Sequence, residues 1–199
     1  KLLLRGPTPL YRLLRDSGRE IIDVCFDTQF GAQQAIDWCR IDAPALASRI
    51  RYQRPQDWPI SLKEILDQAD AAIERHASLP SGGRLLFESG ETLTAIDVDS
   101  GRHATSSGDS KSAQVFLKTN LEAAEEIGWQ LRLRNIGGII VIDFINMADP
   151  AHRRQLIDRL KAVVAGDPAG CWVGSMSRLG LVEMTRRRSS RTPLTWGNS

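Results

Sequence analysis

The sequence has little cysteine, and its cysteines are not arranged for metal binding or cross-linking. The 199 residues include only Cys25, Cys39 and Cys171. An odd number argues against a disulfide framework, and the spacing fits no zinc motif. Free cysteine in apolar surroundings behaves as a small hydrophobic residue. We therefore expect a reducing compartment, the cytoplasm, and no zinc site in this chain.

Long apolar runs, a secretory signal and internal repeats are also missing. No apolar stretch reaches the roughly 20 residues that a membrane-spanning helix needs, so we expect no membrane span. The net charge is only +2, which neither requires nor excludes a nucleic-acid partner. The composition, 42% hydrophobic and 25% charged, is that of an ordinary globular protein with a core of normal size. A first residue of Lys1 in place of Met is compatible with a segment of a longer protein.

The apolar patterns predict an α/β protein with two small mixed α/β units, each with helices packed on a sheet. The first unit, residues 1–78, is expected to contain strands at 21–26 and 50–53, a helix at 28–40, and a helix at 61–77 that opens with a Ser61/Glu64 capping box. The apolar stripe of that last helix (Leu62, Ile65, Leu66) is expected to face a core. A Pro-Ser-Gly-Gly breaker at 80–83 marks the boundary with the second unit, residues 79–199, which ends in a basic tail.

The second unit is expected to contain a hairpin, a polar loop, a long helix and then further strands around one more helix. The predicted ranges are strands 84–89 and 92–98, loop 99–111, helix 112–134, strand 139–145, a helix from Pro150 to Gly166, and strands 171–176 and 181–186. The run 139–145 is the most apolar and is rich in β-branched residues, which predicts a strand buried on both faces. Trp129 and Trp172 are candidates for stacking on bases, but they lie next to apolar runs, and aromatic residues in such positions are usually in the core.

Two aspartates at strand ends are the strongest chemical signal. Asp143 closes the apolar run at 139–142, and Asp97 closes the strand at 93–96. A charged group in such a position is costly unless it is paired or binds a metal, although an exposed strand end that caps a loop is an equally simple interpretation of Asp143 alone. If the strands are parallel neighbours, both carboxylates lie at one edge of the sheet. Such hard oxygen ligands suit Mg²⁺, with Mn²⁺ as an alternative.

Other residues near this edge are weaker candidates. Asp99 points to the same side as Asp97 if the strand continues, but a loop aspartate that bonds its own backbone is the commoner case. Several cations and one amide flank the pair. Taken one at a time, they are more often solvated surface groups than phosphate ligands. The candidates for RNA contact are Arg102, Lys118, Asn120, Arg134 and Arg178.

Six segments together resemble the ribonuclease E/G family, in the order and near the spacing of that family. They are 79–83 (LPSGG), 94–102 (TAIDVDSGR), 119–124 (TNLEAA), 130–134 (QLRLR), 137–145 (GGIIVIDFI) and 177–184 (SRLGLVEM). The strong match covers residues 79–187, and residues 1–78 resemble, more weakly, the RNase H-like subdomain that precedes the catalytic one. The resemblance implies a DNase I-like catalytic subdomain.

The resemblance also implies a chemistry. Asp97 and Asp143 would hold a catalytic Mg²⁺, and water activated by the metal would cleave single-stranded RNA to leave 5′-phosphate and 3′-hydroxyl ends. Asp99 and Asn146 are candidates for the outer shell of the metal, and Asp99 is also a candidate for a third ligand. The family usually has Asn at the position of Asp99 and Asp at that of Asn146, and its Arg-Gly-Gly-Asp loop is Ser-Ser-Gly-Asp here, at 106–109.

Several family parts are not recognised in this chain. These are the OB-fold RNA-binding domain, the 5′-end sensor and the paired-cysteine zinc link that joins subunits, so a homo-oligomer cannot be assumed from the resemblance. Two functions of different class follow from these features. One is a magnesium-dependent endoribonuclease of RNA processing and decay, motivated by the retained Asp97/Asp143 pair. The other is a non-catalytic RNA-binding or assembly module derived from the family, motivated by the altered loop.

Overall fold

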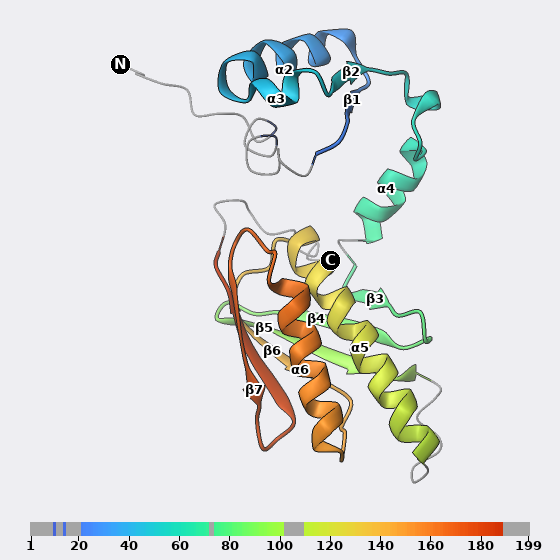
Figure 1. Cartoon of the computed structure of the whole chain (residues 1–199). Coiled ribbons are helices and arrows are strands. Elements are labelled where there is room, and N and C mark those ends of the chain that lie inside the picture. The colour runs from blue at the N-terminus through green and yellow to red at the C-terminus, as the bar shows by residue number, and fades with distance from the viewer. Residues whose placement is uncertain (1–9, 11–13, 15–20, 72–73, 102–109, 189–199) are drawn as a thin grey trace. The chain divides into compact units, whose positions relative to one another are not determined.

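The computed structural model describes residues 10, 14, 21–71, 74–101 and 110–188 (Figure 1). These residues divide into two compact units, 1–68 and 69–199, each with its own hydrophobic core. The α/β fold class predicted from the sequence is confirmed, because both units combine helices with β-sheet. Among the described residues, no helix has the length and apolar character required to cross a bilayer.

The described part of the first unit contains a parallel pair of strands, β1 (Val24–Phe26) and β2 (Ile50–Tyr52), connected through α2 (Gln29–Asp42) and α3 (Pro44–Ala47). Helix α2 begins after Thr28, whose Oγ1 accepts a hydrogen bond from the backbone N–H of Gly31 at 3.2 Å. Leu14 and side chains from these helices and from β2 form a small core (Leu14, Ala32, Ala35, Cys39, Leu46 and Ile50). A 3₁₀ turn, η1 (Pro55–Asp57), and α4 (Leu62–Ala71) follow.

Helix α4 differs from its prediction in length and in burial. The capping box is present, since the backbone N–H of Glu64 donates to Ser61 Oγ at 3.2 Å and that of Ser61 donates to Glu64 Oε2 at 2.8 Å. No residue of the helix is buried, however, so the expected core stripe is exposed. The periodicity identifies the apolar face of a helix but not a partner that covers it. Residues 76 and 77, which we expected to complete this helix, belong to strand β3 (His76–Ser78) instead.

The division between the units lies between Gln68 and Ala69, ten residues before the expected boundary at 78/79. The reason is β3 (His76–Ser78), which is hydrogen-bonded to β4 (Arg84–Ser89) and is therefore the edge strand of the second sheet. The Pro-Ser-Gly-Gly breaker at 80–83 is thus a turn within the second unit.

The described part of the second unit forms a six-stranded sheet in the order β3-β4-β5-β6-β8-β7. Strands β5 (Leu93–Asp99) and β6 (Gly138–Asp143) are parallel, and the other neighbours are antiparallel. The long helix α5 (Ser110–Leu133) connects β5 to β6, which is the crossover that a parallel pair requires. Helix α6 (Pro150–Val164) follows β6, and β7 (Cys171–Met176) and β8 (Leu181–Arg186) complete the sheet.

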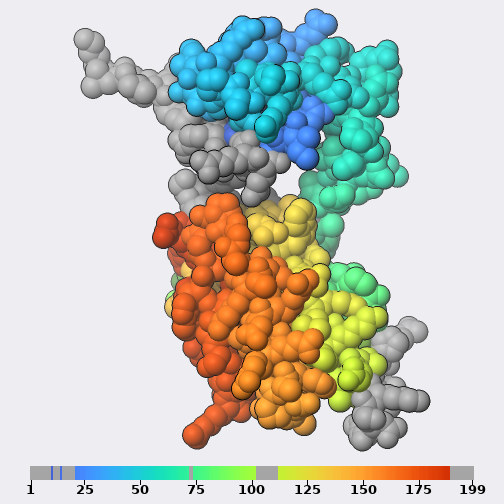
Figure 2. Space-filling view, viewed as in Figure 1, coloured from blue at the N-terminus to red at the C-terminus, as the bar shows by residue number. Residues whose placement is uncertain are grey.

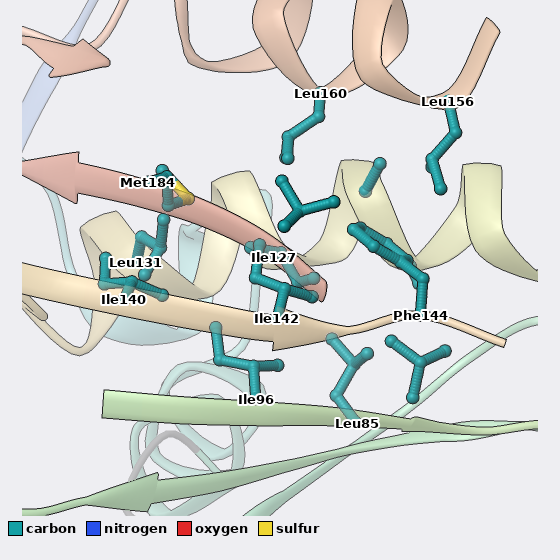
Figure 3. Packing of buried hydrophobic residues seen from close by; sticks show 14 of the residues in the cluster. Leu85, Ile96, Ile127, Leu131, Ile140, Ile142, Phe144, Leu156, Leu160 and Met184 are labelled. Atoms are coloured by element: carbon teal, nitrogen blue, oxygen red, sulfur yellow. The ribbon is translucent and has the colours of Figure 1, made fainter. Parts of the chain in front are cut away.

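Helices α5 and α6 lie on the same face of this sheet, and the core of the unit lies between them and the strands (Figure 1). Figure 3 shows Ile127 and Leu131 of α5 and Leu156 and Leu160 of α6 pointing toward strand residues such as Ile142. In the space-filling view, α6 in orange and α5 in yellow form much of the visible surface of this unit (Figure 2).

Among the described residues, nothing covers the opposite face of the sheet, which we call the open face (Figure 1). This corrects the expectation that the strand at 139–145 is buried on both faces. Ile140 and Ile142 of β6 are fully buried, whereas Ile139, the residue just before Ile140, is 52% exposed. Trp172, in the same row of the sheet, is 62% exposed and so is not a core residue, and neither is Trp129, which is 56% exposed. The apolar residues of this strand therefore alternate between a covered face and an open one.

Candidate metal centre at the ends of two parallel strands

Asp97 and Asp143 are opposite each other on adjacent strands. In the parallel register of β5 and β6, the Cα atoms of Asp97 and Asp143 are partners, and this pair is the last of the ladder. Their chain neighbours Ile96 and Ile142 are buried in the core. Because side chains alternate along a strand, both carboxylates project from the open face. Parallel neighbours lie about 4.8 Å apart, which brings the two carboxylates within reach of one cation.

Both aspartates are exposed, in contrast to the buried charge that the apolar sequence around Asp143 suggested. The cost of a buried charge therefore does not by itself argue for a metal at this position. What remains is the pairing of like charges at one end of the sheet. A divalent cation between two adjacent carboxylates would offset their repulsion.

The electrostatics of Asp97 reflect this pairing. Partial desolvation of the carboxylate, followed by the negative charges of Asp143 and Asp99, raises the pKa of Asp97 above its ordinary value. The backbone N–H of Val98 and the positive charge of Arg84 act in the opposite direction and are smaller. The acidic end of the sheet therefore resists a second negative charge and favours a cation.

Asp99 uses both of its carboxylate oxygens within its own surroundings. Arg84 Nε donates to Asp99 Oδ2 at 3.1 Å, and the backbone N–H of Gly101 donates to Asp99 Oδ1 at 2.8 Å. The two side chains are 58% and 40% exposed, so the ion pair contributes little to stability. Asp99 thus begins the loop after β5 with a local turn. Asn146 lies exposed, three residues beyond Asp143.

Arg84 is a residue near the centre that the sequence interpretation missed. It is the register partner of Asp99 across the hairpin of β4 and β5. In the structure Ser89 pairs with Thr94, so counting back along the hairpin places Arg84 opposite Asp99. The expected strands at 84–89 and 92–98 leave a shorter turn, which would have placed Arg84 opposite Asp97 instead. The hairpin itself was expected, but its register was not counted.

The donor set fits Mg²⁺. Two exposed carboxylates on neighbouring strands are the protein ligands that Mg²⁺ commonly takes, since it keeps several of its own waters. Within the described residues, no group of three or more His, Cys, Asp or Glu side chains is placed to enclose a metal ion. Asp97 and Asp143 could therefore hold a hydrated hard cation, with the remaining coordination open to water and phosphate.

Two of the candidates for RNA contact are exposed near this end of the sheet. Lys118, on α5, has a 73% exposed side chain that lies 3.8 Å from Glu122 Oε1. Arg178 is exposed in the turn between β7 and β8, and the backbone N–H of Ser177 in that turn donates to the carbonyl of Leu181. Leu181 is the register partner of Asp143, so Arg178 lies close to the metal-binding end. Arg102 is outside the described residues.

Asn120 and Arg134, the other two candidates, are fully buried and do not face solvent. The Arg134 guanidinium donates to Gln130 Oε1 and to the backbone carbonyls of Glu74 and His76, and it lies 4.5 Å from the centroid of the Phe87 ring. Arg134 therefore fastens residues 74–76 to α5. We correct its assignment from RNA contact to structure. Asn120 hydrogen-bonds the backbone of Ile145, and its assignment changes for the same reason.

Comparison with known proteins places this arrangement in a family. The family model described as "Ribonuclease E/G family" matches residues 1–189. The chain is 37% identical to ribonuclease E of Haemophilus influenzae over 182 residues, which is 91% of this chain and 19% of that protein. It is 44% identical to ribonuclease E of Escherichia coli over 147 residues, which is 74% of this chain and 14% of that protein.

A second type of relative is ribonuclease G of Escherichia coli, with 32% identity over 179 residues, which is 89% of this chain and 36% of that protein. The chain thus spans between about a seventh and about a third of the length of these three relatives. The family model covers nearly the whole chain, including both units and the Asp97/Asp143 pair. On these grounds, the chain belongs to the ribonuclease E/G family.

Proposed function

We propose that this chain carries the catalytic centre of a magnesium-dependent endoribonuclease that cleaves single-stranded RNA in cytoplasmic RNA processing and decay. The observation that carries the proposal is the register of Asp97 opposite Asp143 at the end of the parallel strands β5 and β6. The names of the relatives, ribonuclease E and ribonuclease G, support the same class of activity. Mg²⁺ is the proposed metal, and Mn²⁺ would be accepted by the same oxygen ligands.

The residues of the chain would have separate tasks in this reaction. Asp97 and Asp143 bind the cation, and Arg178 and Lys118 attract the phosphate backbone. Arg84 offsets part of the negative charge through Asp99. When bound, the cation would polarise the scissile phosphate and activate a water molecule. Hydrolysis forms a bond between the water oxygen and phosphorus and breaks the bond from phosphorus to O3′, so the products carry 5′-phosphate and 3′-hydroxyl ends.

The test is cleavage of a 5′-labelled single-stranded RNA by the whole chain, with and without Mg²⁺. We compare the wild type with Asp97→Asn and Asp143→Asn, which keep the shape of the side chain. Asp158→Asn is the matched control, because Asp158 is an exposed aspartate on α6, across the sheet from the site. Each site variant should lose more than about a hundredfold in rate, since metal stabilisation of the transition state amounts to several kcal/mol.

The chemistry of the ends gives a second readout. Products with 3′-hydroxyl ends can be extended by poly(A) polymerase, whereas cyclic phosphates made by attack of the RNA 2′-hydroxyl cannot. Full activity in either site variant would contradict the proposal. RNA binding that survives EDTA, with no cleavage at high protein concentration, would instead support the non-catalytic module.

A further inference from the structure

Asn120 is a buried amide that both donates to and accepts from the backbone of one residue next to the site. It lies on α5 and is fully buried. Its Nδ2 donates to the backbone carbonyl of Ile145 at 2.8 Å, and the backbone N–H of Ile145 donates to Asn120 Oδ1 at 3.0 Å. The carboxamide thus pairs with Ile145 as a neighbouring strand would.

The hydrogen bonds of Asn120 fix the backbone just beyond the point where the strand ladders of β6 end. The ladder between β5 and β6 ends at Asp143, as does the ladder between β6 and β8. Ile145 follows two residues later, beyond the last pair of either ladder. Asn120 therefore fixes the backbone just past Asp143, and in doing so it limits the freedom of that aspartate.

The neighbouring residues of α5 also hydrogen-bond the turn at 80–83, which packs against the backbone of Asp99, two residues after Asp97. The backbone N–H of Ser81 donates to Glu122 Oε2 at 2.8 Å, and the hydroxyls of Ser81 and Thr119 are 3.3 Å apart. A methyl group at Gly83 would lie 2.6 Å from the carbonyl oxygen of Asp99, so this turn and the Asp99 backbone are in direct contact.

We infer that Asn120 is a positioning residue for the metal site. With Thr119 and Glu122, which hold the turn beside Asp99, it fixes the spacing of Asp97 and Asp143 for the metal. We call these three residues the α5 brace. The inference rests on the proposed function. A carboxamide suits the task because it donates and accepts at once, as the backbone of Ile145 requires. Groups that orient metal ligands affect affinity without touching the metal.

The test uses near-isosteric variants of the whole chain. Asn120→Leu keeps the shape of the side chain and removes both hydrogen bonds. Gln130→Met is the matched control, because Gln130 is also a buried amide on α5, bonded to Glu126 and Arg134 away from the site. Asn120→Ser is a second variant, for use if Asn120→Leu does not fold. We measure thermal unfolding, hydrogen exchange of the Ile145 amide by NMR, and Mn²⁺ affinity from the free-ion signal in electron paramagnetic resonance.

Both Asn120→Leu and Gln130→Met should lower the unfolding temperature. Only the Asn120 variants should speed exchange at Ile145 and weaken Mn²⁺ binding, on the order of tenfold or more. Wild-type Mn²⁺ affinity in a folded Asn120 variant would overturn this inference and leave the proposed function intact. An equal loss of Mn²⁺ affinity in Gln130→Met would do the same. Failure of the proposed metal site gives a different result, because Asp143→Asn would then bind Mn²⁺ with wild-type affinity. In that case the positioning role of Asn120 would be contradicted as well.

Discussion

Asp167 and Arg186 form the most deeply buried ion pair among the described residues, with side chains 1% and 6% exposed. Arg186 Nε donates to Asp167 Oδ2 at 2.8 Å, and Nη2 donates to Oδ1 at 3.2 Å. The remaining Nη1 donates to the backbone carbonyl of Ile136. The pair therefore ties the end of β8 to the turn after α6 and to the chain before β6.

Removing one partner of this pair should destabilise the protein strongly. Arg186→Met leaves the Asp167 carboxylate buried without its cation, which costs about 3–5 kcal/mol in free energy of unfolding. Urea unfolding measures the loss. Arg187→Met is the control, since Arg187 is exposed on the adjacent position. An equally small loss in free energy of unfolding for Arg186→Met and Arg187→Met would show that the buried pair does not hold these segments together.

Cys171 should be a poorly reactive thiol. Burial, followed by the negative charge of Asp167, raises the pKa of Cys171 above that of an ordinary thiol, to about 11. Because the thiolate is the nucleophile, alkylation of the folded protein should keep rising with pH until about pH 11. Peptide mapping after iodoacetamide treatment at a series of pH values measures this, with the urea-unfolded chain as the reference. A midpoint near pH 9 in the folded protein would contradict the expectation.

At the scale of the elements, α5 and α6 pack closely at Gly128. A methyl group at this position would lie 2.2 Å from Cγ1 of Val163. Gly128→Ala should therefore destabilise the protein, because overpacking of about 1–3 kcal/mol exceeds the gain of about 1 kcal/mol in helix propensity.

A double-mutant cycle isolates this contact. In a Val163→Ala background the overlap is removed, and Gly128→Ala should become neutral or stabilising. Urea unfolding of the four proteins measures the coupling. Stabilisation by Gly128→Ala in both backgrounds would show that the helices can separate freely at this point.

The elements that bring the two aspartates together could be predicted from the sequence. The apolar strands that end at Asp97 and Asp143 are separated by one long helical pattern, which is typical of a parallel pair with a helical crossover. The open face could not be predicted. Ile139 and Val141 are as apolar as the buried Ile140 and Ile142, so composition alone does not say which face the helices cover.

The burial of Asn120 and Arg134 had a signal that was not used. Leu117, Ala124, Ile127 and Leu131 are buried along α5, at spacings typical of one helix face. Asn120 and Arg134 fall on the same face, three residues after Leu117 and Leu131. A polar residue on an apolar stripe is expected to be hydrogen-bonded inside the protein, and both are. Their polar character led us to place them at the surface.

For the whole molecule, the functional proposal concerns the second unit. It holds both aspartates, the α5 brace and the exposed cations Lys118 and Arg178. The relatives named ribonuclease E and G are several times longer than the part that this chain matches. Binding energy from other parts of a substrate normally contributes to catalysis, so the rate of RNA cleavage depends on more than the two aspartates. Metal binding depends on them directly and is therefore the better property to measure in this chain.

The most direct measurement is therefore a Mn²⁺ titration of the whole chain, followed by electron paramagnetic resonance of the free ion. We expect one Mn²⁺ site per wild-type chain. Mg²⁺ should displace Mn²⁺ from this site, and Asp158→Asn should leave its affinity unchanged. Asp97→Asn and Asp143→Asn should each weaken this site by more than about a hundredfold, because a direct ligand contributes more than an outer group. Binding of Mn²⁺ with wild-type affinity by either of these variants would contradict the assignment of the pair as a metal centre.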